Sequence, residues 1–233
     1  MSSWPYRLTR AAGSVVTSPF VRVQTWRVAG AAEPVGAAVI VSNHISHFDP
    51  LFLSTLFRRT IDWMTTEEFY ANRLGGAWLR AVNTFPVDRS RPDRRALRLG
   101  LERLRAGRLV GVFPEGGIRA GGTSILGGVA PKSGAAALAR LAEVPIVPCL
   151  IFGSDRLYAA GSWWPGPPRV PIWMTMGAPI RVSKLEGKKA DEHLADAMRE
   201  LGTATIAHFG LKHDDLPTTP QQRMGRSPGL TSD

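Results

Sequence analysis

Four residues able to do chemistry lie close together in the fragment "VSNHISHFDP", residues 41–50: Asn43, His44, His47 and Asp49. A histidine can take a proton from a hydroxyl group when a carboxylate accepts the hydrogen of its other ring nitrogen. The same side chains would also suit a metal site, or an ordinary polar turn between a strand and a helix. The fragment alone leaves these three interpretations open.

The spacing of His44 and Asp49 restricts how their side chains can meet. On a single helix, five positions would rotate the two side chains about 140° apart. They can therefore meet only if His44 lies in a turn and a helix begins near Asp49 and Pro50. Proline is favoured at the first helical position and aspartate just before it. We therefore expect Asp49 to cap this helix and also to orient the imidazole of His44.

A metal site at His44, His47 and Asp49 would need further ligands from elsewhere in the chain. The remaining histidines lie on or just after the last predicted helix and belong to no ligand motif: His193, His208 and His213. We therefore expect no metal, and we interpret His47 as a surface or supporting residue outside the candidate site.

A second polar cluster is "GVFPEGGIR", residues 111–119, which follows an apolar run. Glu115 offers a carboxylate, and Gly116 and Gly117 allow a phosphate to approach their main-chain N–H groups closely. Arg119 can bind a phosphate with two hydrogen bonds, and Arg89 in "FPVDRS" is a further candidate phosphate ligand. The alternative is a glycine-rich turn with a solvated charge pair.

Short apolar strands alternate with helices through most of the chain. We expect strands at 37–41, 60–65, 83–88, 108–114, 144–153 and 168–177, and helices at 50–58, 67–82, 92–107, 133–142 and 188–209. The second helix is expected to break near Gly75 and Gly76. This order predicts a single α/β domain whose mixed, largely parallel sheet is flanked by helices. Because sites gather beyond the carboxyl ends of such strands, the two clusters should share one site.

The domain itself is expected to span residues 29–210. The segment 1–28 interleaves aromatic residues with arginines: Trp4, Tyr6, Phe20 and Trp26 with Arg7, Arg10, Arg22 and Arg27. Such a segment can lie in a lipid interface, although a basic helix packed on its own domain is the alternative. Residues 211–233 carry no apolar periodicity for most of their length and are expected to be a disordered tail.

The net charge of +10 and the pI near 10.7 indicate an anionic partner, such as nucleic acid, an acidic membrane or a phosphorylated substrate. Nucleic-acid binding rests on this charge alone, and no G-x-S-x-G sequence indicates a serine hydrolase. The single Cys149 lies in the apolar run "VPIVPCLIF", so we expect a buried thiol and a reducing compartment.

The blocks "NHISHFD", "FPVDR", "FPEGGIR" and "VPIVP" occur in this order over about residues 41–148. In that order they resemble the blocks of the glycerolipid acyltransferase family, of the lysophosphatidic acid acyltransferase type. The family block E-G-T-R is replaced here by E-G-G-I-R, which moves the arginine one position later. The variant motif leaves another lysophospholipid or a glycolipid open as the acceptor.

The resemblance implies a glycerol-3-phosphate acyltransferase-like fold, with His44 as general base and Asp49 as its orienting partner. It implies that Asn43, Arg89, Glu115, Gly116, Gly117 and Arg119 form the substrate-binding set. The expected reaction moves an acyl group from acyl-CoA or acyl carrier protein to a lysophospholipid hydroxyl, with no cofactor and no metal. Membrane lipids are the expected partners, at the cytoplasmic face of a membrane, with peripheral or monotopic attachment. The alternative is a basic lipid-binding protein of the same fold without catalysis.

Overall fold

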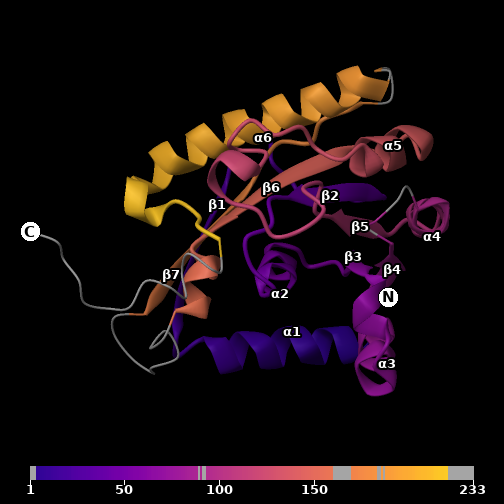
Figure 1. Ribbon diagram of the computed structural model, residues 1–233, viewed down its shortest axis with the longest axis horizontal. Coiled ribbons are helices and arrows are strands. Elements are labelled where there is room, and N and C mark those ends of the chain that lie inside the picture. The colour runs from indigo at the N-terminus through magenta and orange to yellow at the C-terminus, as the bar shows by residue number, and fades with distance from the viewer. Residues whose placement is uncertain are drawn as a thin grey trace, which may run out of the picture.

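The computed structural model describes residues 4–88, 90, 93–159, 169–182, 185 and 187–219. Its strands are β1 (Val21–Arg27), β2 (Ala38–Ser42), β3 (Ile61–Thr66), β4 (Phe85–Val87), β5 (Leu109–Val112), β6 (Ile146–Phe152) and β7 (Val170–Met176). They form one sheet in the order β1-β7-β6-β2-β5-β3-β4 (Figure 1). Neighbouring strands are parallel except for β6 and β7, which run antiparallel. The predicted α/β domain with a mixed, largely parallel sheet is confirmed.

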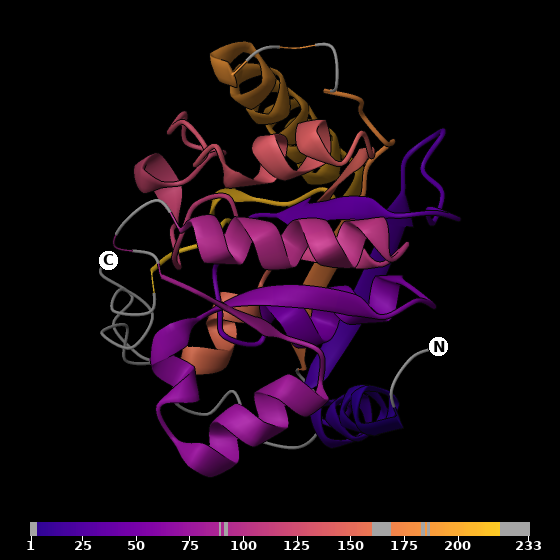
Figure 2. The ribbon, with the colours of Figure 1, turned by 90° about the vertical axis from the view of Figure 1, so that its right-hand side faces the viewer.

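The helices are α1 (Trp4–Thr17), α2 (Asp49–Leu53), α3 (Arg73–Ala81), α4 (Arg94–Arg105), α5 (Gly134–Leu141) and α6 (Gly187–Phe209). Short 3-10 turns are η1 (Ser54–Leu56), η2 (Glu67–Tyr70), η3 (Gly121–Thr123), η4 (Ser154–Tyr158) and η5 (His213–Asp215). Helices α4, α5 and α6 lie on one face of the sheet, and α1, α2 and α3 lie on the other side (Figures 1 and 2). No helix in the described ranges is long and apolar enough to cross a bilayer.

The central strands are buried on both faces, and their side chains alternate between two apolar cores. In β2, Val39 and Val41 face the core under α4, α5 and α6, whereas Ala38 and Ile40 face the core beside α2. On α6 the predicted inner stripe is confirmed, because its four members are buried: Leu194, Met198, Leu201 and Thr205. The buried sheet therefore holds the carboxyl ends of β2, β5 and β6 in fixed positions.

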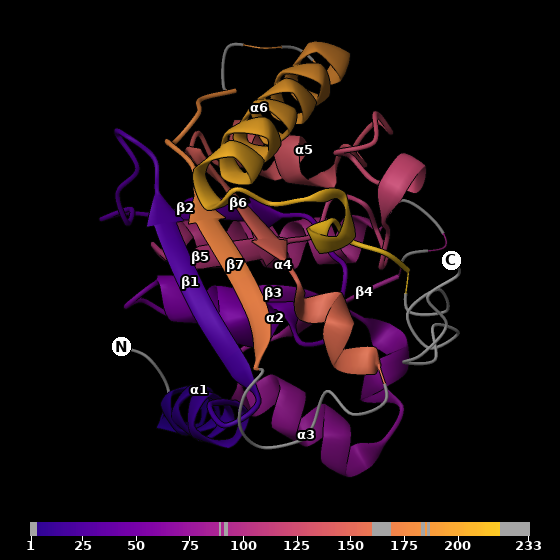
Figure 3. The ribbon, with the colours of Figure 1, turned by 90° about the vertical axis from the view of Figure 1, so that its left-hand side faces the viewer.

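The segment 21–27 is a strand and not part of a separate N-terminal segment. It forms β1, an edge strand that pairs with β7 in parallel, with Val21 opposite Val170 (Figure 3). This corrects the boundary expected at residue 28, because the sheet begins at Val21. The sequence "VRVQTWR" has little apolar contrast between its two faces, and most of its side chains remain at least partly exposed.

Helix α1 packs on its own domain, which was the alternative to a segment lying in a lipid interface. Tyr6 is 6% exposed, and its hydroxyl accepts a hydrogen bond from the main chain of Ile61. Arg10 donates to the carbonyl oxygen of Phe57 at 2.7 Å. The same helix also exposes large apolar side chains, which are Trp4, Leu8, Val15 and Val16. Packing and exposure therefore coexist on α1, and lipid association of this segment stays a prediction.

Two helix expectations are corrected. The helix expected at 50–58 is a short α2 followed by η1, and it ends before Phe57. The expected break at Gly75 and Gly76 is absent, because α3 runs through both glycines. The break lies earlier, where the Asn72 side chain accepts hydrogen bonds from the main chain of Leu74 and Gly75 and so caps the helix.

The tail begins later than residue 211. Leu211 is buried, Asp215 forms an ion pair with Arg156 at 2.7 Å, and the main chain of Thr218 donates to Asp155. Residues 211–219 therefore pack on the domain, and the part of the predicted tail from 220 to 233 lies outside the described residues.

The arginine-rich stretch from 89 to 108 has two roles. Arg94, Arg95 and Arg98 are exposed on α4, as expected for a solvated face. Arg103 and Arg108 instead form ion pairs with the fully buried Asp62 of β3, at 3.0 and 2.7 Å. A buried carboxylate needs such partners, so these two arginines hold α4 and the start of β5 against β3.

Candidate active site

The two residues singled out by their spacing meet at the carboxyl end of β2. The Nδ1 atom of His44 lies 2.9 Å from Oδ2 of Asp49. His44 is 7% exposed and Asp49 is fully buried. Because the carboxylate accepts the hydrogen on Nδ1, the Nε2 atom of His44 carries a lone pair and can accept a proton. The predicted meeting of the two side chains is thus present in the structure, and their roles as base and orienting partner stay a prediction.

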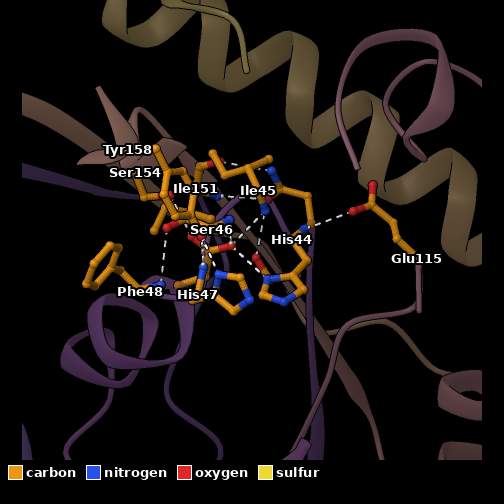
Figure 4. A network of polar contacts seen from close by, with 12 residues as sticks. His44, Ile45, Ser46, His47, Phe48, Glu115, Ile151, Ser154 and Tyr158 are labelled. Atoms are coloured by element: carbon orange, nitrogen blue, oxygen red, sulfur yellow. Dashed lines mark hydrogen bonds and ion pairs between the residues drawn. The ribbon is translucent and has the colours of Figure 1, made fainter. Parts of the chain in front are cut away.

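Asp49 does not cap α2, and this part of the prediction is wrong. The helix begins at Asp49 itself, with Phe48 at the capping position and no side-chain cap. Oδ2 of Asp49 instead turns back to the loop and accepts the main-chain N–H groups of Ile45 at 2.7 Å and Ser46 at 2.8 Å (Figure 4). Ser154 donates to Oδ1 at 2.5 Å. The buried carboxylate therefore has hydrogen bonds to both of its oxygens, which fix its orientation toward His44.

Asn43 lies beside the base, but its side chain holds two strands together. Its Nδ2 donates to the carbonyl oxygen of Ile151 and its Oδ1 accepts the N–H of Ile151, both at 2.9 Å. The residue is 1% exposed. Its amide therefore joins the end of β2 to β6 next to His44, and contact of Asn43 with the substrate stays a prediction.

Glu115 is also a structural link. One carboxylate oxygen accepts the main-chain N–H of His44 and the other accepts that of Ile125, both at 2.9 Å. The main chain of Arg119 in turn donates to the carbonyl oxygen of His44 at 2.8 Å. The loop after β5 therefore holds both main-chain polar groups of the base. Substrate binding by Glu115 stays a prediction beside this structural role.

The environment of Glu115 disfavours its charged form. Burial raises its pKa from 4.5 to about 7, and the nearby negative charge of Asp49 acts in the same direction. The two main-chain hydrogen bonds and the Arg119 guanidinium lower the pKa but only partly offset the burial. Glu115 therefore changes its protonation close to neutral pH.

An aromatic stack supports the imidazole of His44. The ring of Phe113 lies parallel to it with a centroid distance of 4.0 Å, and Trp63 stacks on Phe113 at 4.7 Å. Gly111 lies opposite Trp63 in the sheet, and a Cβ at Gly111 would come closer than 3.0 Å to the indole ring. The glycine is therefore required for the indole to lie flat on β5. The stack fixes one face of the base.

The glycines after β5 differ from each other. Gly116 has a φ of +69°, and the position of its missing Cβ is filled by the side chain of Lys132. The corresponding position at Gly117 is open. Arg119 is exposed just beyond them, and Arg89 lies outside the described residues. Gly117 and Arg119 thus stay candidates for substrate binding, whereas Gly116 makes room for a lysine.

An apolar cavity of about 890 Å³ opens beside His44. Its walls come from α1, α2, β3, η2 and α3, and its lining includes Leu51, Met64, Trp78, Leu79 and Phe113. His44 and His47 both line it. A cavity of this size and character suits a hydrocarbon chain. The base therefore lies where a polar group at the end of an apolar ligand would be placed.

Several residues of the site were missed from the sequence. Ser154 and Tyr158 follow β6, which is parallel to β2, so their side chains come to the same edge of the sheet. The signal was the polar run "GSDRLY" directly after a strand, the same signal that revealed the other two clusters. Within the described part of the chain, no three His, Cys, Asp or Glu side chains gather as a metal site.

A buried His–Asp pair at the carboxyl ends of parallel strands, beside an apolar cavity, is an arrangement that can activate a hydroxyl group next to an apolar ligand. Comparison with known proteins gives the family. The Acyltransferase family model matches residues 26–152, and the chain belongs to this family. The protein is an O-acyltransferase, and membership sets aside the alternative of a binder without catalysis.

Two curated proteins are similar to this chain in sequence. The chain is 29% identical to a 1-acyl-sn-glycerol-3-phosphate acyltransferase of Bacillus subtilis over 182 residues, 76% of this chain and 83% of the relative. It is 26% identical to one of Streptococcus pneumoniae, over 71% of this chain and 58% of that protein. The fold is similar to that of the 1-acyl-sn-glycerophosphate acyltransferase PlsC of Thermotoga maritima, with a TM-score of 0.67, 21% identity, and coverage of 89% of this chain and 80% of that one.

Proposed function

We propose that this acyltransferase moves a fatty acyl group from a thioester to the hydroxyl of a lysophospholipid such as 1-acylglycerol-3-phosphate, in phospholipid synthesis. The observation that carries the proposal is the His44–Asp49 pair at the wall of the apolar cavity. The donor is acyl-CoA or acyl carrier protein, and its acyl chain lies in the cavity. The names of the two curated relatives support the choice of acceptor.

The reaction needs one base and no covalent intermediate. Nε2 of His44 takes the proton of the acceptor hydroxyl, whose oxygen attacks the thioester carbonyl carbon. The C–S bond then breaks, and the leaving thiolate takes the proton back from the imidazolium. Asp49 holds the ring in the reactive tautomer and stabilises the imidazolium, with its own charge fixed by the hydrogen bonds from Ile45, Ser46 and Ser154.

The acceptor phosphate is expected on the β5 side of His44. Gly117 leaves room for close approach, and Arg119 and Lys132 are cationic residues of the same region. Arg89, a candidate phosphate ligand in the sequence, is proposed as a further contact to the acceptor phosphate. Such cations suit a phosphate because they combine charge with directed hydrogen bonds.

The enzyme is proposed to work at a membrane surface. Helices α1 and α3 line the cavity, through Leu8 and Trp78 among others, and the same helices expose further large apolar side chains, which are Trp4, Val15 and Leu74. Together with the net charge of +10, they suit an anionic lipid surface that supplies a lysolipid directly to the cavity.

The test is an acyl-transfer assay that follows free thiol, with purified protein, a panel of lysolipids and both kinds of donor. His44→Ala should lower kcat by about 10²- to 10⁴-fold when it is assayed below its own unfolding temperature. His193→Ala, an exposed residue of α6, is the matched control and should keep the wild-type rate. If His44→Ala retains the wild-type rate, the mechanism is wrong. If no lysophospholipid accepts an acyl group, the proposed acceptor class is wrong.

A further inference from the structure

A second histidine of the same loop lies in the cavity. His47 comes three positions after His44 and lines the same cavity, but it is exposed whereas His44 is 7% exposed. The sequence interpretation left His47 out of the site. The structure instead places its exposed side chain in the same cavity as His44.

The imidazole of His47 is held by Tyr158, from η4 after β6. The main-chain N–H of His47 donates to the Tyr158 hydroxyl oxygen at 2.9 Å, and the Nδ1 atom of the same residue is hydrogen-bonded to that oxygen at 2.5 Å (Figure 4). The Tyr158 ring also lies edge-on to the His47 ring, at a centroid distance of 6.0 Å. Tyr158 therefore holds this residue by two hydrogen bonds and an aromatic contact, and the ring of Phe69 also lies edge-on to the imidazole, at a centroid distance of 6.3 Å.

These contacts favour one tautomer of His47. The tyrosine oxygen already accepts the main-chain N–H, so its own hydrogen is available for Nδ1. A neutral imidazole that accepts at Nδ1 carries its hydrogen on Nε2, and a protonated imidazole also has a hydrogen there. In His44 the ring hydrogen lies on the other nitrogen, because Nδ1–H donates to Asp49 and Nε2 carries a lone pair. The two histidines then present opposite chemistry at the same ring atom.

We propose that His47 donates a hydrogen bond from Nε2 to the carbonyl oxygen of the acyl thioester, and that Tyr158 is the positioning residue that fixes this donor. The inference rests on the proposed acyl transfer. The carbonyl oxygen gains negative charge when the hydroxyl activated by His44 attacks, and a fixed donor stabilises that charge. No proton is transferred in this contact.

The strand order places the partner of His47 and the candidate phosphate ligands on opposite sides of β2. Strand β2, which carries both histidines at its end, lies between β5 and β6. The candidate phosphate ligands Gly117 and Arg119 follow β5, whereas Tyr158 follows β6. Tyr158 thus ties His47 to the β6 side of His44, away from the candidate phosphate ligands, while the His47 side chain lines the cavity proposed for the acyl donor.

Two isosteric substitutions separate the donor from the bond with Tyr158. In His47→Gln, the side-chain amide can donate from about the place of Nε2. In His47→Asn, the shorter side chain can accept from Tyr158 at about the place of Nδ1, but it presents no donor at the place of Nε2. Tyr158→Phe removes the hydroxyl and leaves both rings. His193→Gln on α6 is the control for exchanging an exposed histidine.

Steady-state acyl transfer is measured with palmitoyl-CoA and 1-acylglycerol-3-phosphate, beside thermal unfolding of each variant. We expect His47→Asn to lower kcat by about 10²-fold, as for loss of one oxyanion donor, and His47→Gln to stay within about 10-fold of wild type. Tyr158→Phe should lower kcat by about 10-fold. KM for the acceptor should not change, and His193→Gln should match the wild type.

The opposite ranking would overturn the inference. If His47→Asn equals wild type while His47→Gln is impaired, the residue serves only its bond with Tyr158. If both variants raise KM for the acceptor and leave kcat unchanged, His47 binds the acceptor and not the thioester. An inactive wild-type protein would instead count against the proposed substrates, so the two failures are distinguishable.

A second measurement does not depend on activity. Nitrogen-15 spectra of the imidazoles at about pH 8, where an ordinary histidine is neutral, report which ring nitrogen carries hydrogen. We expect the hydrogen on Nε2 in His47 and on Nδ1 in His44, with assignments from His47→Asn and His44→Ala. A spectrum with the hydrogen on Nδ1 of His47 would overturn the proposed donor.

Discussion

The two faces of the sheet are built differently. On one face, α4, α5 and α6 pack their buried side chains on Val39, Val110 and Leu150 in a continuous apolar core. On the other, α1, α2 and α3 surround a cavity of about 890 Å³ and leave large apolar side chains exposed on α1 and α3. The first face is filled by a packed core, whereas the second combines a core with the cavity that is proposed to bind the acyl chain.

The difference between the faces shows how one sheet can support a packed core on one side and a cavity on the other. Side chains alternate across the strands, so Val39 supports the packed face while its neighbours Ala38 and Ile40 face the other core. The base lies at the end of β2, where the fully packed interior meets the cavity. A change on either face should therefore have a separable effect on folding and on catalysis.

The largest effect on folding is expected from a truncation on the packed face. Leu138 of α5 is fully buried, and Leu138→Ala should lower the free energy of unfolding by about 2–5 kcal/mol, with KM and kcat near wild type below the unfolding transition. Leu79→Ala, which enlarges the cavity, is the matched change on the other face. It should cost less stability and shift the preferred acyl length upward. The free energy of unfolding of both variants is measured in urea. Equal losses in the two would contradict the difference between the packed face and the cavity face.

A smaller loss is expected where the aromatic stack meets the sheet. Gly111→Ala would place a Cβ against the indole of Trp63, so the stack of Trp63, Phe113 and His44 must shift. Overpacking of this kind typically costs about 1–3 kcal/mol, and kcat should fall because the base loses its support. Gly122→Ala, at a position with open space for a Cβ, is the control. An unchanged kcat in Gly111→Ala would show that the stack does not position the base.

The next effect depends on pH. The pKa of Glu115 is raised from 4.5 to about 7 in the folded protein, so between these values the folded state holds a proton that the unfolded state has lost. Its contribution to the free energy of unfolding should therefore fall as the pH rises from 4.5 to 7, and level off above that range. In Glu115→Gln this part of the pH dependence should disappear. Urea titrations from pH 4.5 to 8 measure it, and an identical slope in both proteins would rule it out.

The smallest effect on folding is expected on the exposed side of the cavity face. Replacing Trp4 and Trp78 together by alanine should leave the unfolding temperature nearly unchanged, because they are 73% and 53% exposed. Binding to vesicles with anionic lipid should nevertheless weaken, since these rings suit the headgroup region. Sedimentation with vesicles measures this, with Leu141→Ala on the exposed part of α5 as the control. Unchanged sedimentation would remove α1 and α3 as the lipid-binding surface.

The sequence predicted the central strands and the His44–Asp49 pair because both have local signals. Apolar runs such as "AAVIV" indicate buried strands, and the spacing from His44 to Asp49 allows one geometry only. Strand β1 was missed because its exposed edge lacks a clear apolar face. An edge strand is stabilised by its pairing with β7, which lies far along the chain.

The roles of Asn43 and Glu115 could not be predicted because they depend on long-range contacts. Asn43 bonds to Ile151 and Glu115 to His44, partners separated by 108 and 71 positions. A polar residue next to a catalytic base suggests substrate contact when only the sequence is known. The fold instead uses these side chains to satisfy main-chain groups, as buried polar groups require. The cap expected at Asp49 failed for a local reason, because its Oδ2 accepts the main-chain N–H groups of Ile45 and Ser46 in the preceding loop.

The hydrogen bonds of the loop after β2 have a consequence for its motion. His44, Ile45 and Ser46 belong to no helix or strand. Their main-chain N–H groups nevertheless all donate to side-chain carboxylates, those of Glu115 and Asp49. Opening this loop would strip a buried Asp49 of its partners, which is far costlier than opening an ordinary loop. These amides should thus exchange with solvent deuterium as slowly as those of the neighbouring strands. The loop is then expected to hold His44 in the same position from one turnover to the next.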